Sequence, residues 1–413
     1  MTLRFILAAA ALACSAPEVV AAQAAPPRAA ASANDTLALR RAVTLARANN
    51  PMLAARAADV RAAGARIRPA GTLPDPTLTL GAMNYMLPRL APGGDPMTMN
   101  QVTLMQSLPI NGTLGLRRGV ARADSARAAF QAEAAALEVE SAVRARYWAL
   151  YHDDRALEIM ARRRTVLQEI AEMQLQRYGA ASDLNALLGR PGSAPVVLPS
   201  ASSHDHGAML HTLDMPEPPA LDSLIAIADA QSPEILGAGA SVTGSRANAS
   251  AVRRALIPDL GLGVAYGQRT GYNDMVSLMV SVTLPVFAAS RQYRMRDEAN
   301  AMLDVANDEQ DAVRVRVHAA LATAREQAMT ARRLVALYAQ TLVPQADATY
   351  QAALAAYRVG RVDFATLLDA QTALLEYEHD LHNYEAMYGT AVAEIDRLTG
   401  RPFDSGLSAG REN

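Results

Sequence analysis

A heptad pattern across residues 350–398 constrains the fold more than any other feature of this sequence. Apolar or small side chains recur every seven residues in two series, three residues apart: Leu367, Leu374, Leu381, Tyr388 and Ile395, and Ala370, Tyr377, Tyr384, Ala391 and Leu398. A pattern of this kind, sustained over several heptads, predicts a helix that packs along a neighbouring helix. Residues 299–342 carry a similar stripe, and Pro344 and Gly360 are breaks around the turn between the two runs. We therefore expect a long helical hairpin.

The composition excludes several classes of protein. All 39 basic residues are arginine, they are spread along the chain, and the net charge is −2, which argues against a nucleic-acid partner. With five phenylalanines and one tryptophan, a compact globular core is not expected in a chain of 413 residues. Cys14 is the single cysteine, so the body holds no disulfide framework or thiolate metal site. No nucleophile–base pair or metal cluster falls in a plausible core, so we expect neither an enzyme nor a cofactor.

The N-terminus predicts export. Arg4 precedes a short apolar run at residues 5–13, and small residues near 22–24 provide a cleavage site, so residues 1–24 are interpreted as a signal peptide. Cys14 ends the apolar run as in a lipoprotein signal, which leaves lipidation of Cys14 as an alternative to its removal with the signal. Residues 25–34 are a Pro/Ala/Ser linker.

Residues 35–191 form a first structural repeat. A helix over residues 36–68 is interrupted at Asn49-Asn50-Pro51. The apolar period then changes to two, which predicts strands at about 77–85 and 99–108. Proline-free residues 113–178 follow as a long helix.

Residues 220–402 repeat this order. Gln231-Ser232-Pro233 corresponds to Asn49-Asn50-Pro51, strands are predicted at about 259–266 and 275–285, and a full hairpin at 287–400. Gly400-Arg401-Pro402 closes the second repeat as Gly189-Arg190-Pro191 closes the first. Between them lies a His/Met/Pro-rich linker, 192–219, and residues 403–413 are a tail. The fold class is therefore α+β, mostly α.

The two repeats differ in length. Tyr178 and Tyr357 are 179 residues apart, whereas Gly189 and Gly400 are 211 apart, so the first repeat is 32 residues shorter. If Tyr178 marks the turn as Tyr357 does, the whole deficit falls on the returning helix, which keeps only residues 180–188. The truncated first hairpin would then leave the outgoing helix near Tyr178 without a partner.

Four strands of about nine residues, each with one apolar face, have the length of tilted membrane strands. Four strands cannot close a barrel, and lipid does not tolerate open edges, so we expect the chain to oligomerise. Three copies would supply 12 strands. A soluble two-sheet module with coiled-coil arms is the alternative.

The order of short motifs resembles the outer-membrane efflux proteins, the TolC-like family. These motifs are Asn50-Pro51, Leu73-Pro74-Asp75-Pro76, Pro96-Met97-Thr98-Met99, Leu108-Pro109, Tyr357-Arg358-Val359-Gly360 and Leu367-Leu368-Asp369-Ala370-Gln371. The resemblance implies a homotrimeric channel-tunnel with a 12-stranded β-barrel in outer-membrane lipid and an α-helical barrel that extends into the periplasm. Its expected partners are a periplasmic adaptor (membrane fusion) protein and an inner-membrane pump, and its activity is passive export.

The resemblance also assigns roles in the second hairpin. Tyr357 matches a residue that holds the periplasmic mouth shut, and Asp369 matches an acidic ring at the constriction. Thr366 stands where a second acidic ring is expected. Val359 and Gly360 match the tip that contacts the adaptor. The alternatives are a packing role for Tyr357 and a solvated helix face for Asp369.

Two groups of side chains bear on the cargo. Met97 and Met99 offer thioethers, which suit cuprous ion, and His204, His206 and His211 offer imidazoles for copper or other transition metals. Pro96-Met97-Thr98-Met99 resembles the heavy-metal branch of the family, so we expect metal efflux. A solvated linker, multidrug efflux, a type I secretion exit duct and a non-conducting coiled-coil member are the alternatives.

Overall fold

The computed structural model describes residues 36–85, 95–163, 167–198 and 215–402. The expected signal peptide, Cys14, the 25–34 linker, the histidines of the 192–219 linker and the 403–413 tail lie outside these ranges. None of the helices described combines the length and the hydropathy needed to cross a bilayer.

Each repeat begins with a helix that is broken at a proline. In the first repeat α1 (Leu39–Asn49) is followed by α2 (Pro51–Ala70), and in the second α6 (Leu221–Gln231) is followed by α7 (Pro233–Arg254). Proline is tolerated in the first turn because the missing N–H has no partner there. The Asn50 side chain caps α2 by accepting from the Met52 amide at 2.9 Å. The interruption expected at Asn50-Pro51 is confirmed.

Four strands form one antiparallel sheet in the order β1-β2-β3-β4. They are β1 (Thr77–Met83), β2 (Met99–Leu108), β3 (Leu260–Gln268) and β4 (Met275–Val282). The expected strands lie at these positions, with ends that differ by up to three residues. β1 ends early because Asn84 adopts a positive φ of 57°, and β4 ends before Pro285, which has no N–H to donate to a ladder.

The first hairpin consists of α3 (Thr113–Arg163) and α4 (Leu167–Leu187), which pack against each other. Arg177 pairs with Asp154, and Arg146 pairs with Asp183 at 3.4 Å, so α4 runs antiparallel to α3. The chain therefore reverses between Arg163 and Leu167. The prediction of a single helix as far as Tyr178 is wrong, because Tyr178 and Gly179 lie inside the returning helix.

The second hairpin is longer in both arms. Its outgoing arm comprises α8 (Gln292–Leu337), a π-helical turn η1 (Tyr338–Leu342) and α9 (Val343–Arg358), of 46, 5 and 16 residues, together 67. Its returning arm is α10 (Phe364–Thr399), of 36 residues. The corresponding helices of the first repeat have 51 and 21 residues. The first hairpin is thus shorter by 16 residues in one arm and 15 in the other, so it is shortened evenly and α3 keeps its partner.

The turn of the second hairpin lies where the sequence predicts it. Gly360 has a φ of 70°, and Asp363 caps α10 by accepting from the Thr366 amide at 2.9 Å. Pro344 does not break the helix as expected. Instead the π-helical turn η1 lies just before Pro344, and the outgoing arm continues as a helix although proline has no N–H to donate.

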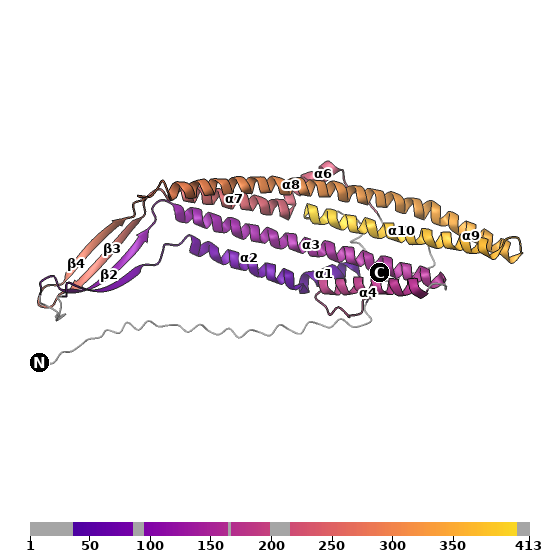
Figure 1. Ribbon diagram of the computed structural model, residues 1–413, viewed down its shortest axis with the longest axis horizontal. Coiled ribbons are helices and arrows are strands. Elements are labelled where there is room, and N and C mark those ends of the chain that lie inside the picture. Colours follow the sequence, from indigo (N-terminus) through magenta and orange to yellow (C-terminus); the bar gives the residue numbers. More distant parts are fainter. Residues whose placement is uncertain (1–35, 86–94, 164–166, 199–214, 403–413) are drawn as a thin grey trace, which may run out of the picture. The chain divides into compact units, whose positions relative to one another are not determined.

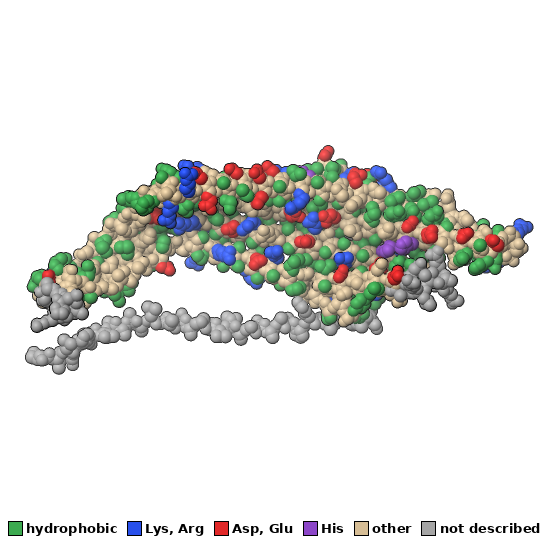
Figure 2. All heavy atoms as spheres, in the orientation of Figure 1, with side chains coloured by type: hydrophobic (Ala, Val, Ile, Leu, Met, Phe, Trp, Pro, Cys, Tyr) green, Lys and Arg blue, Asp and Glu red, His purple; other side chains and the backbone are tan. Residues whose placement is uncertain are grey.

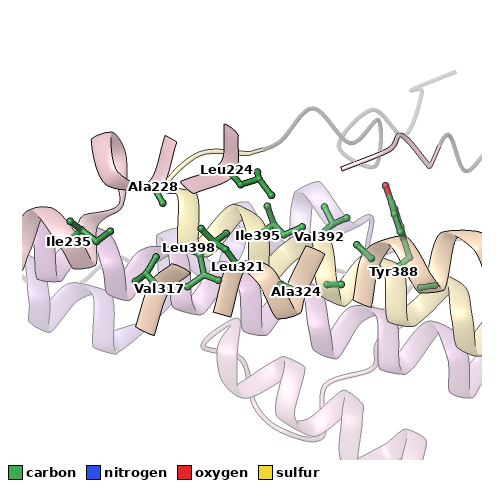
Figure 3. Close-up of a cluster of buried hydrophobic side chains, with 13 residues drawn as sticks. Leu224, Ala228, Ile235, Val317, Leu321, Ala324, Tyr388, Val392, Ile395 and Leu398 are labelled. Carbon is green, nitrogen blue, oxygen red and sulfur yellow. The ribbon is translucent and has the colours of Figure 1, made fainter. Parts of the chain in front are cut away.

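Each repeat has its own apolar core, built from equivalent elements. In the second repeat α6, α7, α8 and α10 supply residues that include Leu224, Ile235, Leu321, Tyr388 and Ile395 (Figure 3). In the first repeat α1, α3 and α4 supply Ala46, Val143, Leu150 and Leu184 among others, and Leu188 joins them just after α4. The long helices lie side by side, with α3 packed on α2, α7 and α10, so α3 joins the two repeats (Figure 1).

The glycine at the end of each repeat packs against the start of the same repeat. Gly189 and Gly400 both have positive φ, of 64° and 79°. A Cβ on Gly189 would lie 2.7 Å from the Asn49 carbonyl oxygen, and one on Gly400 would lie 2.6 Å from the Gln231 carbonyl oxygen. Each glycine thus approaches the joint between the first two helices of its own repeat, which supports the duplication inferred from the sequence.

Candidate functional site: the sheet and the end of the second hairpin

The sheet has one apolar face. Leu78, Leu104, Val264 and Leu278 lie directly opposite one another across the four strands. These side chains are exposed, Leu278 to 82%. No strand residue is charged, whereas acidic and basic side chains are dispersed over the helices on the face in view (Figure 2). A continuous apolar surface of this kind requires a cover, and in a membrane barrel lipid provides it.

The opposite face carries polar and small side chains together with methionines. Thr79, Thr103, Ala265 and Ser277 form one row across the sheet, and Ser107, Gly261 and Ser281 form another. This alternation is the pattern of a membrane barrel, with an apolar outside and a polar lumen.

Both outer edges of the sheet are free within the described part of the chain, because β1 pairs only with β2 and β4 only with β3. Unpaired N–H and C=O groups cannot be left in lipid. A membrane location therefore requires that β1 and β4 pair with strands of other copies.

Tyr357, Val359, Gly360 and Asp369 lie at the end of the second hairpin. The Tyr357 ring contacts Phe364 across the turn, with 6.1 Å between ring centroids, and Val359 and Gly360 are exposed. Asp369 is exposed on α10, between the apolar heptad positions. The structure brings Tyr357 to the tip with Val359 and Gly360, and leaves Asp369 facing solvent in a single copy.

Asp363 and Thr366 have a local structural role. Hydrogen bonds from the Thr366 hydroxyl and amide lower the pKa of Asp363 below its usual value. Asp363 is therefore an ionised N-cap of α10, and Thr366 donates the hydrogen bonds that this cap accepts.

Sequence reasoning missed a polar interface between α3 and α10. The polar run His152-Asp153-Asp154 has the composition of a solvated helix surface, but Asp153 is buried and the His152 ring lies 4.9 Å from that of His379, centroid to centroid. Burial, with a further contribution from His152, lowers the pKa of His379. The run has no unusual residue type, so only the identity of the helix opposite would have revealed the burial.

The same interface holds further hydrogen bonds and ion pairs. The Tyr151 hydroxyl donates to Glu385 at 3.2 Å, His382 contacts Glu385 at 2.9 Å, and Arg144 pairs with Asp396. Burial raises the pKa of Tyr151 well above its ordinary value. These contacts connect the first repeat to the second, and they form no nucleophile–base pair.

The structure describes some of the candidate metal ligands, the methionines, but not the histidines. Among the described residues no three His, Cys, Asp or Glu side chains are grouped as a metal ion would need. Met99 begins β2 on the polar face, and Met97 is exposed in the preceding loop, where its amide donates to Asp95. His204, His206 and His211 lie outside the described residues.

The fold combines a four-stranded sheet that has one apolar face with two long helical hairpins. Residues 224–401 match the family model "Outer membrane efflux protein". No curated protein sequence matches the chain.

Three solved structures show the same fold. The open state of the Neisseria gonorrhoeae MtrE outer membrane channel is 16% identical with a TM-score of 0.72, covering 88% of this chain and 89% of that one. The Vibrio cholerae outer membrane protein VceC is 16% identical with a TM-score of 0.69, covering 89% and 97%. CusC, described with transmembrane channel formation, is 17% identical with a TM-score of 0.65, covering 88% and 92%.

These comparisons show the fold, and the family match covers residues 224–401. The family match lies in the second repeat, and the structural likeness extends over both.

Proposed function

We propose that this protein is the outer-membrane conduit of a tripartite efflux system and that it exports heavy-metal cations such as copper. In the proposed assembly three copies close a 12-stranded barrel, and their long hairpins form a tube in the periplasm. The observation that carries the proposal is the four-stranded sheet with an exposed apolar face, a polar face and two free edges.

The even shortening of the first hairpin favours a conducting channel over a non-conducting family member. A helix left without its partner would have argued for a degenerate protein, but α3 packs on α4 along the shortened hairpin. A periplasmic adaptor would contact Val359 and Gly360, the exposed end of the longer hairpin, and an inner-membrane pump would deliver the cargo.

Asp369 is proposed as the acidic ring of the constriction and Tyr357 as the gate residue. Threefold symmetry would place three Asp369 carboxylates at one level, which attracts cations. Their mutual repulsion also raises the cost of ionising all three.

The test is the conductance of the purified mature chain in a planar bilayer, with the oligomeric mass measured in the same detergent. We expect cation-preferring openings from a trimer. Asp369→Asn should lower the preference for cations, whereas Asp308→Asn, which removes an exposed carboxylate of α8, should not. A monomer without conductance would contradict the proposal.

The cargo is tested separately, in cells that lack their own channel of this kind. Expression of the chain with its adaptor and pump should raise copper tolerance, and replacement of Met97 and Met99 by Leu together with His204, His206 and His211 by Ala should reduce that gain. Tolerance gained to drugs alone would favour multidrug efflux.

A further inference from the structure

Methionine is confined to one face of the sheet. The strands contain five methionines, and the strand register places all of them on the polar face: Met83, Met99, Met105, Met275 and Met279. The apolar face is built mainly from Leu, Val and Tyr side chains, with Ala82, Asn100, Gln106 and Gln268 towards its ends, and has no methionine. Because methionine is itself apolar, hydrophobicity alone would have placed it on the other face.

Three of these methionines gather at one end of the sheet. Met83 is directly opposite Met99 in the β1–β2 pair, and Met275 is directly opposite Gly267 in the β3–β4 pair. Met99 bridges the two pairs, because its sulfur lies 2.7 Å from where a Cβ of Gly267 would be. Gly267 thus leaves room for the Met99 thioether to extend across β3 towards Met275.

A second arrangement of the same kind lies further along the strands. Met105, Gly263 and Met279 occupy one row, and the Met279 methyl group lies 3.3 Å from where a Cβ of Gly263 would be. In both places a glycine of β3 is covered by a methionine side chain from a neighbouring strand.

Filling of gaps does not account for these positions. Methionine fills irregular gaps in apolar cores, where it is buried. Here Met83 is 44% exposed, and Met99 and Met275 are only partly buried, so all three are accessible from the polar face.

Thioethers are uncharged, soft ligands that select Cu(I) over hard divalent ions. Three thioethers on β1, β2 and β4 at one end of the sheet fit a soft monovalent cation, which needs few ligands and no compensating carboxylate. The uncharged strands around the cluster agree with this, because a hard cation would require oxygen anions.

We propose that Met83, Met99 and Met275 form a thioether site for a soft monovalent cation, Cu⁺ or Ag⁺, on the lumen face of the sheet. Met105 and Met279 provide further thioethers for the cation, further along the same face of the sheet. The inference rests on the proposed function, because a site on the lumen face contacts cargo only if the sheet closes into an export channel for metals. It narrows the cargo to soft, monovalent ions, and it adds Met275 of the second strand pair to the methionines of the first.

The experiment measures Ag⁺ binding to the purified trimer by isothermal titration, with Ag⁺ as the probe because it is stable to oxidation. All samples carry His204→Ala, His206→Ala and His211→Ala, so that linker imidazoles contribute nothing. The test variant is Met83→Leu/Met99→Leu/Met275→Leu, which keeps apolar volume and removes the sulfurs. The control is Met295→Leu/Met302→Leu, which removes two exposed thioethers from α8.

We expect the test variant to bind Ag⁺ about tenfold more weakly or worse, a loss of about 1.4 kcal/mol or more, and the control to bind as the background does. If the test variant does not form trimers, methyl-labelled methionine NMR of the background protein replaces it, and Ag⁺ should shift the Met83, Met99 and Met275 methyl signals. Unchanged Ag⁺ affinity in the trimeric test variant, or unshifted signals, would overturn the site.

The proposed thioether site and the proposed export of metal can be contradicted independently of each other. Weaker Ag⁺ binding by the test variant, with no metal tolerance conferred on cells, would support the site and contradict metal export. Unchanged Ag⁺ binding by the test variant, with copper tolerance that depends on the chain, would overturn the site and leave the proposed function standing.

Discussion

Trp148 of α3 packs against Gly389 of α10, where the two repeats meet. Trp148 is 7% exposed, and a Cβ on Gly389 would lie 2.2 Å from its Nε1 atom and 2.3 Å from its Cε2 atom. These distances are far inside van der Waals contact, and the indole is a rigid ring. Gly389→Ala therefore requires that the ring or one of the helices move.

The expected cost follows from two opposing effects. Overpacking a tight contact destabilises by about 1–3 kcal/mol, while replacing a helical glycine by alanine stabilises by up to about 1 kcal/mol. Gly179→Ala in α4 isolates the second effect, because no atom lies within 4 Å of the Cβ position there. Gly389→Ala should thus be less stable than Gly179→Ala by about 1–3 kcal/mol.

The assay uses the fact that Trp148 is the only tryptophan of the chain. Its fluorescence reports on the surroundings of this one ring, so Gly389→Ala should shift the emission as well as lower the unfolding midpoint, and Gly179→Ala should leave the emission unchanged. In a Trp148→Leu background, followed by circular dichroism, Gly389→Ala should lose most of its cost. Equal midpoints for the two alanine variants, with equal emission spectra, would refute the reasoning.

Two further predictions concern the same interface. The pKa of His379 is lowered in the folded chain, so the unfolded chain takes up this proton at a higher pH, and stability should fall as the pH drops below about 6.5 towards the folded-state pKa. In thermal unfolding between about pH 7.5 and pH 5.5, His379→Gln should make this loss of stability smaller. An unchanged slope would contradict the effect of burial beside His152. Arg144→Gln removes a partner of the buried Asp396 carboxylate and should lower the free energy of unfolding by about 1–3 kcal/mol. Arg146→Gln breaks an exposed ion pair and should change the unfolding midpoint little. Equal shifts of the midpoint in the two variants would contradict the difference expected from burial.

The strands and the duplication could be predicted from the sequence because both have strong local signals. The change of apolar period from about 3.6 to 2, bounded by prolines, marked all four strands to within three residues. The paired prolines Pro51 and Pro233 marked equivalent helix breaks, and both breaks are present.

The turn of the first hairpin could not be predicted because residues 163–167 contain no glycine or proline. Tyr178-Gly179 offered a stronger turn signal, yet Gly179 has helical neighbours on both sides and nothing packed against it. A helical glycine of this kind costs at most about 1 kcal/mol, which the packing of α4 on α3 outweighs.

The partners of α10 were also only half predicted. The heptad pattern implies a neighbouring helix without identifying it, and it pointed to α8 alone. In the structure α10 packs equally on α3, where Ala386, Gly389 and Ala393 allow close approach. Small residues beside a heptad seam were the available signal for this second partner.

The even shortening of the first hairpin changes how any gate must be built. Sixteen fewer residues in the outgoing arm correspond to about 24 Å of helix, so the first hairpin ends well before the level of Tyr357. In the proposed trimer, a constriction at that level would receive side chains only from the second hairpins. One Asp369 and one Tyr357 from each copy would have to close it without help from the first repeat. Since three side chains span less of a ring than six, we expect such a gate to close less tightly than one built from both hairpins.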